Sequence, residues 1–171
     1  MSQEQMSQEM DQENKQIIRF KVGAEEYGVE IMRVKEVIRI KQITQLPKTP
    51  SFVKGVINLR GDVIPVIDLR EKFGLSEGSY SGMTRVIVVE VEGKSIGMVV
   101  DEVRQVLRIP SGQIEPPPAL AGGLSGEFLE GVGKQPEDRL VILLSIDRIL
   151  TTEEKLELEE METSAAEAGV Q

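Results

Sequence analysis

An internal repeat constrains the fold of this 171-residue chain more than any other feature. Residues 17–40 align without gaps on residues 86–109, so that identical glycines and valines recur at the same places in both segments. Two further blocks follow in the same order: FVKGV at 52–56 over FLEGV at 128–132, and VIPVIDLR at 63–70 over VILLSIDR at 141–148. Three matching blocks in one order indicate a duplication, so the sequence predicts two units of the same fold.

Each copy has the pattern of a series of short strands. In the first copy the expected strands are residues 17–22, 27–31, 37–40, 56–59 and 63–67. A short helical turn is expected over 30–35, because Ile31, Val34 and Ile38 share helical spacing. The last two strands should form a hairpin about Arg60-Gly61-Asp62. Pro65 cannot donate to a ladder, so its strand should be an edge strand or bulged.

Five short strands in about 55–60 residues are too few for a sandwich and suit a small closed barrel. We therefore predict an all-β protein with short helices, built from two tandem five-stranded barrels. The predicted barrels span residues 17–78 and 79–150, with a flexible link near 75–82. Residues 1–16 are expected to form a disordered lead. Residues 151–171 are expected to form a short acidic helix that frays into a disordered tail.

The composition excludes several classes of function. Cysteine and histidine are both absent, which removes disulfides, thiol nucleophiles and the ligands of ordinary zinc sites. The formal net charge of −9 opposes nucleic-acid binding, because a nucleic-acid binder needs a basic surface. No signal-peptide pattern and no apolar run long enough for a bilayer is present, so we expect a cytoplasmic protein. We identify no catalytic set, cofactor or metal site.

Apolar residues exceed what two small barrels can enclose. Val99, Val100, Val103, Val106 and Leu107 crowd one stretch, and Ile31, Val34, Val37 and Ile38 crowd another. A barrel of this size holds only part of each strand's apolar side chains. The surplus must pack between the barrels or stay exposed as binding patches. Core packing is the simpler reading for any single residue, but the set favours an interaction face.

Several blocks resemble CheW chemotaxis coupling proteins. They are YGVEI at 27–31, VKEV at 34–37, FVKGVINLRG at 52–61, VIPVIDLR at 63–70, IGMVVDEV at 96–103 and DRIL at 147–150. The resemblance covers about residues 17–158. It implies two five-stranded SH3-like barrels that share an apolar seam. It also implies a non-catalytic adaptor that couples the helical tip of chemoreceptors to the regulatory domain of the histidine kinase CheA. Such a protein would be recruited to membrane-associated receptor arrays without inserting into the membrane, and it could associate weakly with itself.

The resemblance also implies two sets of contact residues. The receptor-binding set, in the groove between barrels, is Val34, Glu36, Gly55, Asn58, Arg60, Gly97, Val99, Val103 and Val106. The kinase-binding set, at the barrel ends, is Ile38, Ile40, Ile43, Glu115, Ala119 and Leu120. At the positions of Glu115 and Leu120 the family carries a basic residue and an aromatic, so this chain departs from the pattern there.

Physical roles can be assigned to the receptor-side residues. Gly55 and Gly97 would let a helix approach the backbone closely, and the valines would supply apolar area. Arg60 could clamp receptor carboxylates with bidentate geometry. Alternatively, Arg60 forms a local ion pair with Asp62 or Asp68.

Two other readings stay open from the sequence. The chain could be the regulatory part of a kinase or the adaptor half of a receiver-containing protein, although we expect no further domain between Met1 and the acidic end. It could also be a small barrel that binds RNA, or an enzyme that uses paired carboxylates such as Asp101-Glu102 and Glu153-Glu154.

Overall fold

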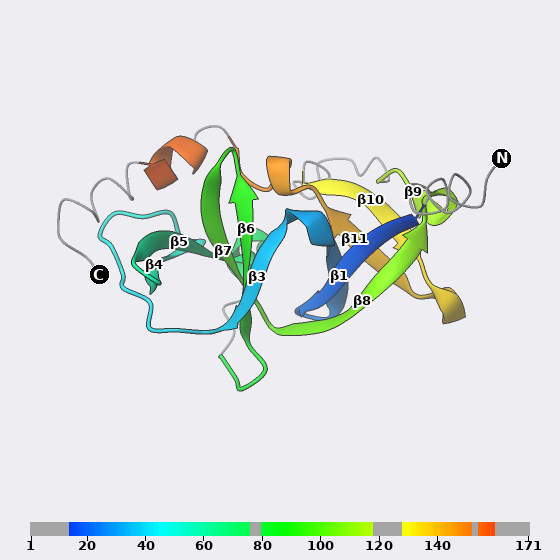
Figure 1. Ribbon diagram of the computed structural model, residues 1–171, viewed down its shortest axis with the longest axis horizontal. Coiled ribbons are helices and arrows are strands. Elements are labelled where there is room, and N and C mark those ends of the chain that lie inside the picture. Colours follow the sequence, from blue (N-terminus) through cyan, green and yellow to red (C-terminus); the bar gives the residue numbers. More distant parts are fainter. Residues whose placement is uncertain (1–13, 76–79, 118–127, 152–153, 160–171) are drawn as a thin grey trace.

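The computed structural model describes residues 14–75, 80–117, 128–151 and 154–159. These residues form two β-sheets that lie next to each other along the long axis of the molecule (Figure 1). Short helices connect the strands, so the prediction of a mainly β protein with short helices is confirmed.

The two repeat copies produce the same order of main strands, with different short helices between them. The first copy forms β1 (Asn14–Val22), β2 (Glu25–Glu30), η1 (Ile31–Arg33), β3 (Val34–Arg39), β4 (Val53–Leu59), β5 (Asp62–Asp68) and α2 (Leu69–Lys72). The second copy forms β6 (Arg85–Val91), β7 (Lys94–Val100), β8 (Glu102–Pro110), η2 (Ser111–Gln113), β9 (Ile114–Glu115), β10 (Leu129–Lys134), η4 (Pro136–Asp138), β11 (Leu140–Leu144) and η5 (Ile146–Arg148). Each expected strand of the first copy is present, and the expected turn at 30–35 is the three-residue helix η1.

Strand β1 begins earlier than the sequence indicated. Asn14, Lys15 and Gln16 were assigned to the disordered lead, yet they pair with Pro110, Ile109 and Arg108 of β8. These three residues are all polar, so they show no alternation of apolar and polar side chains that would predict a strand. Only their pairing with β8 identifies them as part of β1. Residues 1–13 lie outside the described part of the chain.

The two sheets exchange their first hairpins. One sheet has the order β3-β6-β7-β5-β4, and the other has the order β8-β1-β2-β11-β10-β9. The β1–β2 hairpin of the first copy therefore lies among second-copy strands, and the β6–β7 hairpin of the second copy lies among first-copy strands. The expected division into 17–78 and 79–150 does not describe these sheets. Both copies have the same strand pattern, so the sequence cannot tell which copy a hairpin joins.

Each sheet closes on itself at the equivalent place. In the first sheet the chain that leaves β3 returns at Thr44, which pairs with Val56 of β4. In the second sheet the chain that leaves β8 returns as β9, whose Ile114 and Glu115 pair with β10. The closing segment is a two-residue strand in one barrel and a single bridge in the other. For this reason one sheet has six strands and the other has the expected five.

The largest apolar core lies between the barrels. Each barrel encloses a small cluster, with Ile57, Val66 and Val88 in one and Ile17, Val141 and Leu143 in the other. The opposite faces of the same strands form a third and larger cluster, which we call the seam. Its buried members come from both copies and include Ile18, Phe20, Val53, Ile67, Ile87, Val89, Met98, Phe128 and Leu144. Each such side chain stabilises the fold by about 1.5–3 kcal/mol relative to an exposed one.

Pro65 lies in an interior strand rather than at an edge. Strand β5 pairs with β4 on one side and with β7 on the other. The ladder with β7 begins at Val66, one residue after Pro65, which pairs only with Val56 of β4. The missing N–H of Pro65 therefore precedes the second ladder, which reconciles a proline with an interior strand.

The acidic end of the chain forms a helix that is attached to the barrels. Residues 154–159 are helical, and Leu158 is buried in the seam. Glu154 pairs with Lys72, whose Nζ lies 4.5 Å from the Phe52 ring centroid and 5.0 Å from that of Phe128. The helix is thus held to both repeat copies through one lysine. The expected fraying beyond residue 159 falls outside the described residues.

The exchange of hairpins predicts that neither half of the chain folds alone into its native barrel. A fragment of residues 1–80 lacks β6 and β7, and its own β1–β2 hairpin lacks β8 and β11. We expect far-UV circular dichroism to show an unfolded fragment, and mixing with residues 81–171 to restore the spectrum of the intact chain. A cooperative thermal transition of the isolated 1–80 fragment would contradict this expectation.

Candidate protein-binding site

The seam reaches solvent along two equivalent edge strands, β3 and β8. Val34 and Val103, which are identical positions of the repeat, are half-buried against the seam. Val37 and Val106, the next equivalent pair, are 38% and 49% exposed. Their direct partners in the ladders are Ile87 and Ile18, which are buried in the seam. These four valines form an exposed apolar border, which we call the valine margin.

Three residues of the expected receptor-binding set are buried instead. Gly55, Gly97 and Val99 have almost no exposed surface. Val99 packs in the interior of the five-stranded barrel, and a Cβ on Gly97 would lie 2.8 Å from Val86. Direct contact with a receptor helix does not fit this burial. Each of these residues has a packing role in the barrel.

Gly55 allows the first barrel to close. Its φ is +140°, and an added Cβ would lie 2.1 Å from the carbonyl oxygen of Thr44 on the closing segment. Gly131, its equivalent in the second copy, has the same function, because an added Cβ there would lie 2.8 Å from the carbonyl oxygen of Glu115. The close approach predicted for Gly55 is real, but the approaching backbone belongs to the protein itself.

Arg60 and Glu36 form a bidentate ion pair at the surface. Arg60 Nη1 donates to Glu36 Oε1 at 3.2 Å, and Nη2 donates to Oε2. This hydrogen bonding lowers the pKa of the Glu36 carboxyl from its ordinary value. The expected partners, Asp62 and Asp68, do not form this pair, and Asp68 instead accepts a hydrogen bond from the backbone N–H of Arg70. The pair joins β3 to the β4–β5 turn, which lie far apart in the sequence.

The β4–β5 turn presents Arg60 in an unusual backbone conformation. Arg60 has φ +53° and Gly61 has φ +91°, and the Asn58 side chain accepts a hydrogen bond from the Gly61 N–H at 2.8 Å. A positive φ is costly for a residue with a long side chain. Asn58 and Arg60, both assigned to the receptor side, are therefore exposed members of one turn.

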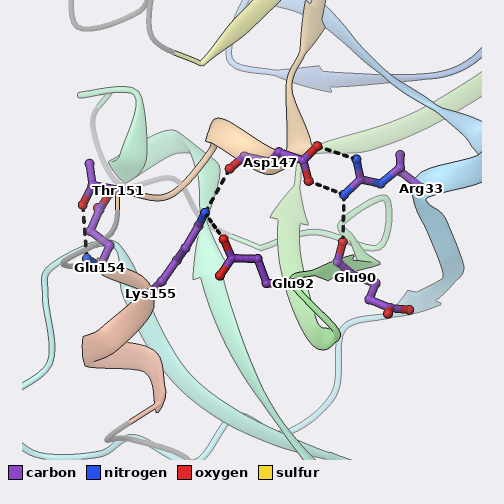
Figure 2. A network of polar contacts seen from close by, with 7 residues as sticks. All are labelled: Arg33, Glu90, Glu92, Asp147, Thr151, Glu154 and Lys155. Carbon is purple, nitrogen blue, oxygen red and sulfur yellow. Dashed lines mark hydrogen bonds and ion pairs between the residues drawn. The ribbon is translucent and has the colours of Figure 1, made fainter.

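A polar network holds the start of β3 (Figure 2). Arg33, the residue before Val34, donates to both carboxylate oxygens of Asp147 at 3.0 and 2.7 Å and to the Glu90 carbonyl at 3.1 Å. Lys155 joins the same network through the Asp147 carbonyl at 3.2 Å and the Glu92 carboxylate at 3.0 Å. The network thus links η1 to the second copy and to the helix 154–159, and it positions the first valine of the margin. No sequence motif indicated it.

The structure describes four of the expected kinase-binding residues, Ile38, Ile40, Ile43 and Glu115. Ile38, Ile40 and Ile43 are half-buried and pack on the interior cluster of the five-stranded barrel. Glu115 is exposed on the closing strand of the other barrel and pairs with Lys134 at 2.6 Å. Ala119 and Leu120 lie outside the described residues.

The described residues carry exposed apolar side chains of the kind found on interaction faces. Within the described ranges, no group of three or more acidic side chains could hold a metal ion. None of the helices seen there is long and apolar enough to cross a membrane. The arrangement offers exposed apolar surface and a surface ion pair at the edge strand β3, which suits the docking of another protein.

Comparison with known proteins supports this interpretation. A family model described as a CheW-like domain matches residues 16–154. The chain belongs to the CheW family. CheW relatives include the chemotaxis protein CheW of Klebsiella aerogenes, which is 44% identical over 135 residues that cover 79% of this chain and 81% of the relative. The CheW protein of Helicobacter pylori is 38% identical over 143 residues, covering 84% and 86%.

A solved CheW structure has the same fold. The crystal structure of the scaffolding protein TtCheW from Thermoanaerobacter tengcongensis matches with a TM-score of 0.75 and 38% identity. The match covers 82% of this chain and 94% of TtCheW. The CheW fold expected from the sequence motifs is therefore confirmed.

The closure role of Gly55 predicts a loss of stability on substitution. Gly55→Ala should lower the free energy of unfolding by about 2–4 kcal/mol, because the new Cβ meets backbone that cannot move without opening the barrel. Gly82→Ala is the matched control, since an added Cβ there meets nothing within 4 Å. Urea unfolding followed by circular dichroism measures both. Equal stability of the two variants would show that Gly55 is not required for closure.

Proposed function

We propose that this protein is a non-catalytic adaptor of bacterial chemotaxis that couples chemoreceptors to the histidine kinase CheA. The observation that carries the proposal is the exposed valine margin on a CheW fold, with Glu36 of the Glu36–Arg60 pair on the same edge strand, β3. Apolar surface next to a charged side chain suits a helix that offers apolar residues and carboxylates on one face. The names of the relatives, chemotaxis protein and scaffolding protein, support the same role.

The receptor tip would lie against the valine margin. Val34, Val37, Val103 and Val106 provide apolar area from both repeat copies, and Arg60 provides a cationic side chain that is 70% exposed although it is paired. A receptor carboxylate could replace Glu36 as the partner of Arg60, because exchange of one surface ion pair for another costs little. Of the original receptor-side set, the proposal retains the accessible members and leaves out Gly55, Gly97 and Val99.

The kinase would bind at the barrel ends. Ile38, Ile40 and Ile43 lie at one end, and Glu115 lies on the closing strand of the other barrel. These two places are equivalent under the repeat, so the protein could contact a second double barrel through either end. The same geometry would allow weak self-association in arrays, with the protein in the cytoplasm beneath membrane-bound receptors.

The adaptor is favoured over a regulatory domain of a larger kinase. The curated relatives named CheW are matched over 81–94% of their own length, so those relatives consist of little more than this fold. The net charge of −9 disfavours a barrel that binds RNA. The described residues hold no cluster of acidic ligands that would support a barrel enzyme with paired carboxylates.

Reconstitution tests the proposed coupling. Addition of this protein to chemoreceptor cytoplasmic fragments and CheA should raise the rate of kinase autophosphorylation above that of the kinase with receptor fragments alone. The protein by itself should neither bind nor hydrolyse ATP. A kinase rate that is unchanged by the protein, with all three components shown to be folded, would refute the adaptor role.

Two substitutions test where the receptor binds. Arg60→Ala should weaken binding of the receptor fragment about tenfold, because a charge-assisted hydrogen bond is lost. Val34→Glu should weaken it at least as much by placing a carboxylate in the apolar margin. Arg139→Ala and Leu140→Glu, at exposed positions of the other sheet, are the controls. Sedimentation measures binding and circular dichroism checks the fold. Normal binding by both margin variants would place the receptor elsewhere.

A further inference from the structure

Two arginines face each other across β3 and β6. Arg39 and Arg85 are direct partners in the ladder, so their side chains leave the same face of the sheet. Like charges directly opposite each other destabilise a sheet. Within the described residues, no carboxylate forms an ion pair with either arginine, although the chain has a net charge of −9. The fold therefore keeps a repulsive pair that any neutral residue would remove.

The arginine pair continues the valine margin. On the same face of the sheet, the next ladder pair inward is Val37 with Ile87, and Ile87 is buried in the seam. Arg85 is held in place because its Nη1 donates to the carbonyls of Gly82 and Thr84 at 2.9 and 2.8 Å. Arg39 is exposed at the end of β3. The apolar margin thus ends in two guanidiniums on this barrel.

The second barrel repeats the arrangement with one cation. There Val106 pairs with Ile18, and the next pair is Arg108 with Gln16. Arg108 is the repeat equivalent of Arg39, and Gln16 stands where the other barrel has Arg85. An exposed valine followed by an exposed arginine therefore occurs twice in equivalent places. The valine margin therefore differs in charge between its two strands, and its part on β3 is the more cationic.

We propose that Arg39 and Arg85 together bind a carboxylate of an acidic, amphipathic helix whose apolar side chains lie on Val37. The proposal rests on the adaptor function above and names the chemistry of the receptor segment that meets this face. Val37 and Arg39 are about 6.6 Å apart along the strand, close to the rise of about 6 Å between helix residues four apart. A helix with an apolar residue and a glutamate or aspartate at that spacing fits both.

Stability and binding should change in opposite directions in Arg39→Gln. Loss of the like-charge pair should raise the melting temperature by about 1–3 °C. The same substitution should weaken binding of a chemoreceptor cytoplasmic fragment about tenfold in low salt, and less in 0.5 M NaCl, where charges are screened. Arg39 is the position to change, because Arg85→Gln would also lose the hydrogen bonds to Gly82 and Thr84.

Arg139→Gln is the matched control, since Arg139 is also exposed but lies in the other sheet's loop and pairs loosely with Glu26 at 3.8 Å. It should change binding less than twofold and should not raise the melting temperature. Calorimetry and sedimentation with the intact chain provide the two measurements.

The outcomes separate this inference from the function on which it rests. If Arg39→Gln binds the fragment as tightly as the unchanged protein, or melts no higher, the arginine pair is not a carboxylate site while the adaptor role stands. If neither protein binds the fragment, the adaptor role itself fails. If deletion of the acidic residues 160–171 enlarges the difference in melting temperature between Arg39→Gln and the unchanged protein, the chain's own end is the occupant and the proposal is overturned.

Discussion

A barrel of about five short strands encloses only one face of each strand, and the other face must be covered by something else. In this protein the two barrels cover each other. The interiors bury a few aliphatic side chains apiece, whereas the seam buries residues from nearly every long strand, from η5 and from the helix 154–159. Because surface ion pairs contribute about 0–1 kcal/mol each, the seam dominates the energetics.

The exchange of hairpins makes the seam inseparable from the barrels. Strands β1 and β2 complete a barrel made by the second copy, and β6 and β7 complete one made by the first. Neither barrel can open without disturbing the other, so the fold should behave as one cooperative unit. A rigid relation between barrels is what a docking face needs when it takes residues from both, as the valine margin does with Val34 and Val103.

The valine margin exists because the seam must end at solvent. At the edge strands β3 and β8, the strand faces that form the seam are no longer covered by the other barrel. Val37 and Val106 therefore keep apolar surface exposed beside buried Ile87 and Ile18. Charged residues border this surface, with the Glu36–Arg60 pair and the two arginines of the β3–β6 ladder on one barrel. Apolar contact can then supply affinity while the charges select the partner.

The sequence alone determined the strands, the duplication and the family, because alternating side chains, turn residues and ordered motifs are local features that survive without coordinates. It also predicted a receptor-binding set, of which Val34, Asn58, Arg60 and Val106 are accessible in the structure. Only the tertiary structure decided that hairpins cross between copies, that Gly55 contacts Thr44, and that Arg60 pairs with Glu36. These three features depend on which of two equivalent strands a segment meets in the fold. A repeat gives both strands the same sequence pattern, so the sequence does not identify the partner.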